Sequence, residues 1–203
     1  MKTHIWKTIC LSLAMLLCAL ADTSISTLFA EETEGGSESM QIQSSAFDEG
    51  ATIPKKHTCE GEDVSPHLSI SAPPAEAKSL VLICDDPDAP VGTWVHWVLF
   101  GLAPDTRDLP EGVPSDAEVL GGAKHGRNDF GNLGYGGPCP PPGPAHRYFF
   151  KLYAVDTEPV LNVGATKAEV LQAIEGHILA ETQLMGRYGR KGNSEILTTD
   201  RLQ

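Results

Sequence analysis

The chain has few basic residues. Of its 203 residues, 15 are Lys or Arg and 27 are Asp or Glu, which gives a formal net charge of −12. A general nucleic-acid binder needs a basic stripe that displaces phosphate counterions, and the sequence has none. The acidic charge would also be repelled by anionic membrane surfaces. We therefore expect neither general nucleic-acid binding nor electrostatic attachment to membranes.

Several signatures of enzymes and metal sites are also missing. The sequence has no G-x-S-x-G motif, which carries the nucleophile of α/β-hydrolases. The cysteine spacings are not those of a zinc site. The glycine-rich segment 131–137 is not followed by the Gly-Lys-Ser/Thr of a phosphate-binding loop. We expect no catalytic residues of these classes, no metal and no cofactor.

The first residues have the pattern of a secretory signal peptide. Lys2 and Lys7 precede an apolar run at residues 9–17, and a small-residue cleavage motif, Ala-Leu-Ala, ends at Ala21. The apolar run is too short to span a membrane. We expect cleavage after Ala21, with Ala30 as the alternative, and hence a periplasmic or secreted protein without stable membrane insertion.

The remaining length suits one domain. Residues 22–39 are polar and acidic with little periodicity, and are predicted to form a disordered linker. The folded domain is expected at residues 40–190, followed by a tail at residues 191–203. The sequence has no internal repeats.

Apolar segments bounded by turn residues predict a β-rich domain. The strongest strands are expected at residues 80–84, 95–100 and 147–155. Weaker alternation predicts further strands at residues 40–47, 68–72 and 184–188. Residues 113–130 carry several glycines and few apolar residues, and are expected to be irregular.

One convincing helix is predicted after these strands. Thr166 and Glu169 have the spacing of a capping box, and Gly176 is a natural C-terminal stop. A short turn at residues 177–181 could continue this helix. The expected architecture is mainly β and sandwich-like, with an appended C-terminal helix.

Three of the five cysteines lie beyond the expected signal peptide. Cys84 ends an apolar strand and is predicted to be a small buried hydrophobic residue. Cys59 and Cys139 lie in turn-rich loops, so they are the better candidates for a disulfide in an oxidising compartment. An odd count leaves one thiol free, and the sequence leaves open whether this pair is bridged.

Polar residues with chemical potential cluster in two segments. The first contains Asp85, Asp86, Asp88 and His96, and the second contains Tyr135, His146, Arg147 and Tyr148. Each segment leads into a strongly apolar strand, so the two segments can meet and bind a small anion. Each residue also has a plainer interpretation. Aspartates are common in turns, His96 could be a core histidine, and Arg147 is expected to pair with a carboxylate.

The longer motifs resemble a known family. DDPDAP, then W-x-H-W, then YGGPCPPPGPAHRYFFKLYAVD resemble the phosphatidylethanolamine-binding protein family, in its bacterial Raf-kinase-inhibitor-like branch. The resemblance covers about residues 40–190. It implies a large antiparallel sheet packed on a smaller sheet, with C-terminal helical structure. It also implies a shallow, metal-free pocket that binds anions.

The resemblance further implies which residues line this pocket. It predicts that Asp86 and His96 lie in one concavity with His146 and Tyr148. The full set of ligand-binding residues that it implies is Asp86, Asp88, Pro90, Trp94, His96, Tyr135, Gly137, His146 and Tyr148. Pro144 and Ala145, just before the second histidine, depart from the family pattern and leave the shape of that loop open.

The expected function is that of an exported binding protein rather than an enzyme. The ligand would be a small anion with a phosphoryl or carboxylate group, such as phosphate or phosphoethanolamine. The protein would inhibit or modulate a partner protein such as a protease or kinase. The alternative is a hydrolytic enzyme that uses the His, Asp and Tyr side chains of the pocket. The sequence leaves the natural ligand, the protein target and the oligomeric state open.

Overall fold

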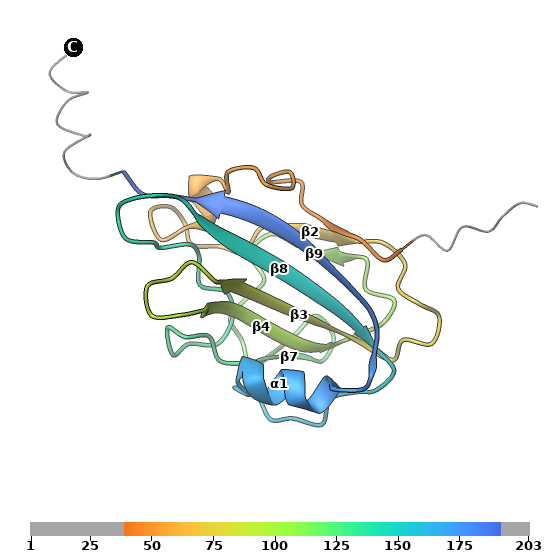
Figure 1. Ribbon diagram of the computed structural model, residues 1–203. Helices are drawn as coiled ribbons and strands as arrows, with labels where there is room; N and C mark the ends of the chain where they lie inside the picture. The colour runs from red at the N-terminus through yellow and green to blue at the C-terminus, as the bar shows by residue number, and fades with distance from the viewer. Residues whose placement is uncertain (1–38, 192–203) are drawn as a thin grey trace, which may run out of the picture. The chain divides into compact units, whose positions relative to one another are not determined.

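The computed structural model describes residues 39–191, which form two antiparallel β-sheets, one α-helix and one 3₁₀ helix (Figure 1). The larger sheet has the strand order β6 (Glu118–Val119), β7 (Ala123–His125), β4 (Trp94–Leu102), β3 (Ser79–Asp86), β8 (His146–Val155) and β9 (Ile178–Tyr188). The smaller sheet has the order β1 (Ile42–Gln43), β2 (Leu68–Ile70) and β5 (Asp108–Leu109). The helices are the 3₁₀ helix η1 (Lys55–His57) and the α-helix α1 (Lys167–Ile174).

This arrangement confirms the expected fold class, a large antiparallel sheet with a smaller sheet and a C-terminal helix. The predicted signal peptide and the predicted tail beyond Lys191 lie outside the described residues. So does all of the predicted linker except its last residue, Ser39.

Both faces of strand β3 are buried, which explains its nearly continuous apolar sequence. Successive side chains of a strand point to opposite faces of the sheet. Leu80 and Leu82 pack in the core that includes the smaller sheet. Val81 and Ile83 pack in a second core together with Val170 of α1. The smaller sheet and α1 therefore cover opposite faces of the larger sheet, as Figure 1 also shows.

The structure corrects the prediction for the segment after α1. Residues 177–181 do not continue the helix, because β9 already begins at Ile178 and pairs with β8 along its length. Backbone pairing with an existing strand outweighs the weak local helix preference of these residues. The predicted capping box is confirmed: the Thr166 hydroxyl accepts from the Glu169 backbone N–H, and Glu169 accepts in return from the Thr166 backbone N–H.

Residues 113–130 are also less irregular than predicted. Strands β6 and β7 lie within this segment and extend the larger sheet beyond β4. Both strands are very short and carry no clear alternation, so their sequence gives little signal. They form because the edge of β4 offers free backbone groups for pairing.

Candidate functional site

A cavity of about 220 Å³ lies where the ends of β3, β4 and β8 meet. The strand ends supply polar side chains, and two loops supply apolar ones. The residues that line the cavity are Asp86, Ala89, Pro90, Val91, Trp94, His96, Phe130, Cys139, Pro140, Pro141, His146 and Tyr148. The prediction that Asp86 and His96 share a concavity with His146 and Tyr148 is therefore confirmed.

Strand pairing explains why these residues converge. Asp86 is the last residue of β3 and pairs with Trp94, the first residue of β4. Strand β8 runs antiparallel on the other side of β3, so its first residues reach the same end of the sheet. His146 and Tyr148 are two apart on β8 and therefore project to the same face. The rings of Tyr148 and His96 meet edge to face, with centroids 5.1 Å apart.

Asp86 positions its neighbours. Its carboxylate is 3% exposed, and each oxygen has a protein partner. Oδ1 accepts a hydrogen bond of 2.8 Å from the backbone N–H of Asp88, and Oδ2 accepts one of 2.8 Å from Nδ1 of His146. A buried carboxylate bonded in this way fixes the orientation and tautomer of the histidine.

His96 is held from the other side of the cavity. Its Nδ1 lies 2.6 Å from the carbonyl oxygen of Gly136, which can only accept, so Nδ1 carries a proton and donates it. Burial lowers the pKa of His96, opposed by the hydrogen bond to Gly136 and by the charge of Asp86. The neutral ring therefore presents Nε2 as an unprotonated nitrogen. Nε2 becomes a donor only when the ring takes up a second proton.

Two further polar groups of the lining residues lack partners. The indole N–H of Trp94 and the hydroxyl of Tyr148 are buried and make no hydrogen bond to the described part of the chain. Burial, and then the charge of Asp86, raise the pKa of the Tyr148 hydroxyl, so it stays protonated and able to donate. A buried donor without a partner is costly, so these two groups favour an acceptor at the site.

Asp88 does not line the cavity, although it was predicted as a ligand-binding residue. It pairs instead with Arg147, whose Nε and Nη2 lie 2.9 and 2.7 Å from its two oxygens. The hydrogen bond from Arg147 lowers the pKa of Asp88 to about 2. This bidentate pair ties the β3–β4 loop to the start of β8, and it confirms the carboxylate partner expected for Arg147.

Tyr135 and Gly137 also lie away from the cavity. The Tyr135 ring is buried against Trp97, and its hydroxyl donates to the carbonyl oxygen of His57 at 2.9 Å. The backbone N–H of Gly137 donates to Asp63 Oδ1 at 2.7 Å. These contacts direct both residues toward the segment around η1, where they line a separate cavity of about 230 Å³ that shares Phe130 and Cys139 with the first.

Several lining residues were not predicted from the sequence. Phe130 is the most informative, because its ring lies 5.4 Å from that of His96 and 5.5 Å from that of Trp94. It belongs to the segment that was expected to be irregular, and a single aromatic among glycines and asparagines gave no pattern to interpret. Val91, Pro140 and Pro141 complete the apolar part of the wall.

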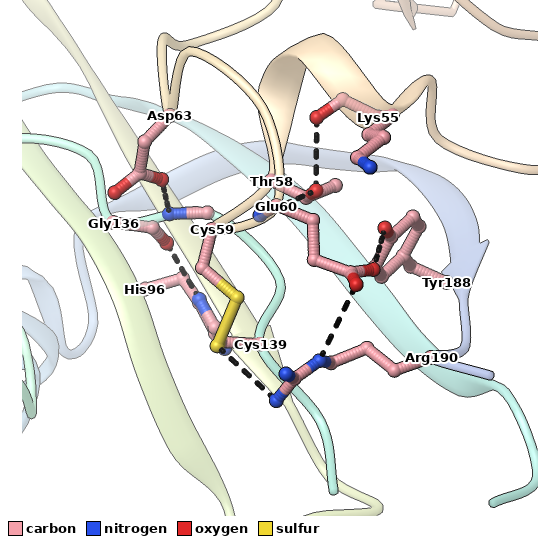
Figure 2. The surroundings of a disulfide bond; sticks show 11 residues. Lys55, Thr58, Cys59, Glu60, Asp63, His96, Gly136, Cys139, Tyr188 and Arg190 are labelled. Atoms are coloured by element: carbon pink, nitrogen blue, oxygen red, sulfur yellow. Dashed lines mark hydrogen bonds and ion pairs between the residues drawn. A yellow bond between two sulfur atoms is a disulfide. The ribbon is translucent and has the colours of Figure 1, made fainter. Parts of the chain in front are cut away.

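A disulfide fixes one wall of the cavity. Cys59 and Cys139 are bridged, with Cα atoms 5.4 Å apart, and Cys84 is a free, buried cysteine. Both outcomes match the sequence predictions. Figure 2 shows this disulfide beside the hydrogen bond between His96 and Gly136. Because Cys139 itself lines the cavity, the bridge holds that wall against the segment around η1.

Comparison with known proteins identifies the family. The family model for phosphatidylethanolamine-binding protein matches residues 43–189. The chain belongs to the phosphatidylethanolamine-binding protein family. The resemblance noted in the sequence motifs is thereby confirmed.

Proteins with similar sequences come from several organisms. A UPF0098 protein of Methanothermobacter thermautotrophicus is 52% identical over 151 residues, which cover 74% of this chain and 99% of the relative. A UPF0098 protein of Aquifex aeolicus is 47% identical over 157 residues, which cover 76% of this chain and 91% of the relative.

Solved structures of family members have the same fold. The phosphatidylethanolamine-binding protein homologue CT736 of Chlamydia trachomatis is 44% identical, with a TM-score of 0.70, and the match covers 76% of this chain and 100% of the other. Escherichia coli YbcL is 33% identical, with a TM-score of 0.70, and the match covers 75% and 99% of the two chains.

Residues 39–191 lack two other features. No helix there has the length and apolar character needed to cross a bilayer. No group of three or more His, Cys, Asp and Glu side chains there is arranged to hold a metal ion. The cavity itself offers two histidines and one carboxylate that is already bonded on both oxygens.

Proposed function

We propose that this family member is an exported binding protein whose cavity holds a small anion with a phosphoryl or carboxylate group. One observation carries this proposal. Two imidazole rings, His96 and His146, line the same cavity and are each fixed through Nδ1. Neither Nε2 atom makes a hydrogen bond to the described residues. Two fixed imidazole rings in one site, each a donor from Nε2 in its imidazolium form, suit a ligand with several acceptor oxygens.

The proposed binding mode uses the remaining polar groups as well. In the imidazolium form each histidine donates from Nε2, and the buried Tyr148 hydroxyl and Trp94 indole N–H would become two neutral donors if the side chains that cover them shift when the ligand binds. The negative charge of Asp86 is offset when His146, which bonds to its Oδ2, is in the imidazolium form. The small volume, about 220 Å³, suits a head group rather than a large molecule.

We further propose that the cavity binds its ligand without catalysing a reaction of it. Cys139 lines the cavity, but its sulfur is in the disulfide and is not available as a nucleophile. The lining residues include no serine or threonine hydroxyl. The hydrolytic alternative would therefore need water activated by a histidine, and an esterase assay on wild type and His96→Ala would detect it.

We propose that the protein binds a partner protein, such as a protease or kinase, and inhibits or modulates it. Two large apolar residues at the cavity, Val91 and Phe130, are 79% and 43% exposed. Exposed apolar side chains beside a cavity are common where proteins meet. A partner could place an acidic side chain in the cavity and pack apolar groups on this rim.

Export is supported by the disulfide together with the signal-like sequence. Disulfides such as that between Cys59 and Cys139 persist mainly in oxidising compartments. The proposed location is the periplasm or the medium.

NMR titration tests the proposed ligand class. Phosphate, phosphoethanolamine and acetate are each added to the full chain while the imidazole resonances of His96 and His146 are followed. Millimolar phosphate or phosphoethanolamine should shift both rings, more strongly at pH 5.5 than at pH 8, because the protonated rings donate from Nε2. The His96→Ala/His146→Ala variant should lose the response. Unchanged resonances at about ten millimolar of every anion would refute anion binding.

A further inference from the structure

A second cavity, of about 480 Å³, lies at the edge of the larger sheet and has no role in the function proposed above. It is lined by β1 and β9 and the segment between β1 and η1. Its lining residues are Gln41, Ile42, Gln43, Ser44, Phe47, Asp48, Glu49, Thr182, Gln183 and Leu184. Both β1 and β9 are the outermost strands of their sheets, so two strand edges border one groove.

The backbone of β9 presents unpaired groups at this groove. Along β9, Met185 and Arg187 direct their N–H and C=O away from β8, because these groups bond to residues 49–53. Backbone direction alternates along a strand, so Gln183 and Glu181 face the same way. Neither has a backbone partner on that side among the described residues.

Strand β1 presents its own free groups in the same manner. The backbone N–H of Ser71 donates to the carbonyl oxygen of Gln41, and the N–H of Gln41 donates to Ser71 Oγ, so Gln41 faces β2. Its neighbour Ile42 therefore directs its N–H and C=O away from β2. Ile42 lines the groove, and its backbone groups have no partner within residues 39–191.

The start of β9 is exposed and apolar. Ile178 and Leu179 are 43% and 40% exposed, whereas the second half of β9 is covered by residues 49–53. A long uncovered edge is a template for pairing with another strand. Residues 49–53 already pair with the second half of β9. An added strand would pair with the first half, next to them.

The charge of the groove indicates what kind of strand fits it. Its lining contains Asp48 and Glu49 and no Lys, Arg or His. One Glu49 oxygen accepts from the Met185 backbone N–H, and both acidic side chains line the groove. A second copy of this chain, with a net charge of −12, would bring the same charges to the contact.

We propose that this groove binds an extended, basic peptide segment of a partner protein by adding it as a strand to β9. The main chain of the peptide pairs with Gln183 and Glu181 on one side and reaches Ile42 on the other. Its Lys or Arg side chains lie beside Asp48 and Glu49. This is the β-augmentation mode of peptide recognition, with charge selecting the partner.

The test uses two capped hexapeptides, one alternating Lys with Val and one alternating Glu with Val. Each is added to the full chain at up to a few millimolar, and backbone amides are followed by NMR and hydrogen exchange. The Lys peptide should shift the amides of Ile42, Glu181 and Gln183. It should also slow exchange at Gln183 by about tenfold or more. A Lys peptide with N-methylated backbone nitrogens should lose this effect, because it cannot donate.

A matched pair of variants separates main-chain pairing from side-chain contact. Gln183→Pro removes the outward N–H and fixes φ, which an edge strand tolerates, and should weaken Lys-peptide binding about tenfold or more. Gln183→Ala keeps the N–H and should bind like wild type. The proposal is overturned if the shifts map elsewhere, or if the Glu peptide or the methylated peptide binds equally well. Dimerisation in ultracentrifugation that Gln183→Pro abolishes would also overturn it, because the occupant would then be a second copy.

Discussion

Removing the disulfide between Cys59 and Cys139 should cost more stability than any other single change discussed for this protein. The perturbation is the double variant Cys59→Ser/Cys139→Ser, compared with the oxidised wild type. The two cysteines are separated by 80 positions, so the bridge closes a long loop. In the chain-entropy model a loop of that length restricts the unfolded chain by about 4.5 kcal/mol at 25 °C.

Urea unfolding followed by circular dichroism measures this loss directly. With a slope of about 2 kcal/mol per molar urea, the midpoint should fall by about 2 M. Reductant should lower the wild-type midpoint by a similar amount and leave the double variant unchanged, which controls for the serine substitutions. The reasoning fails if the double variant loses less than about 1 kcal/mol while the wild type is shown to be fully oxidised.

The same variant tests whether the bridge matters for the cavity. Cys139 lines the wall next to the Gly136 carbonyl that holds His96. A loosened wall should weaken phosphate binding. The phosphate affinity of the variant is measured without urea, under conditions in which the variant is still folded. Equal phosphate affinity in both forms would mean that the bridge stabilises the fold without shaping the site.

Three further predictions concern pH and single contacts. Burial lowers the pKa of both His96 and His125 below 6.5, so these two histidines bind more protons in the unfolded chain than in the folded one. The free energy of unfolding should therefore fall as the pH drops below about 6.5. Urea midpoints measured at pH 7.5 and pH 5 check the sign. Asp88→Asn should lower the free energy of unfolding by no more than about 1 kcal/mol at pH 7, because the pair with Arg147 is partly exposed. This loss should disappear as the pH falls from about 4 toward 2, where wild-type Asp88 also becomes neutral. A loss that persists at pH 2 would contradict the prediction. Thr166→Ala removes the N-cap of α1 and should cost about 1 kcal/mol, visible as a fall of about 2–4 °C in Tm, whereas Thr166→Ser should behave like wild type.

The sequence was most informative where the structure is governed by local chemistry. The capping box at Thr166 and Glu169 follows from the residues of one turn, and it is present as predicted. The three strong strands follow from short apolar runs, and each is present with slightly wider bounds. The turn residues around Cys59 and Cys139 indicated exposed loops, and those two cysteines are the bridged pair.

Where the sequence failed, a partner distant in the chain decided the outcome. Residues 177–181 have no strong preference of their own, and they are a strand because β8 lies beside them. Strand β7 pairs with the edge of β4, and β6 pairs in turn with β7. Such short elements take their conformation from hydrogen bonds to another strand, which a local pattern does not contain.

The candidate site divides in the same way. The sequence by itself determined that Asp86, His96, His146 and Tyr148 lie at the ends of strong strands. The family resemblance predicted that these four residues share one pocket. Only the tertiary structure decided that Asp88 turns to Arg147 and that Tyr135 and Gly137 face the segment around η1. The reason is physical: a side chain's type is local, but its partner is set by strand register and loop closure between distant segments.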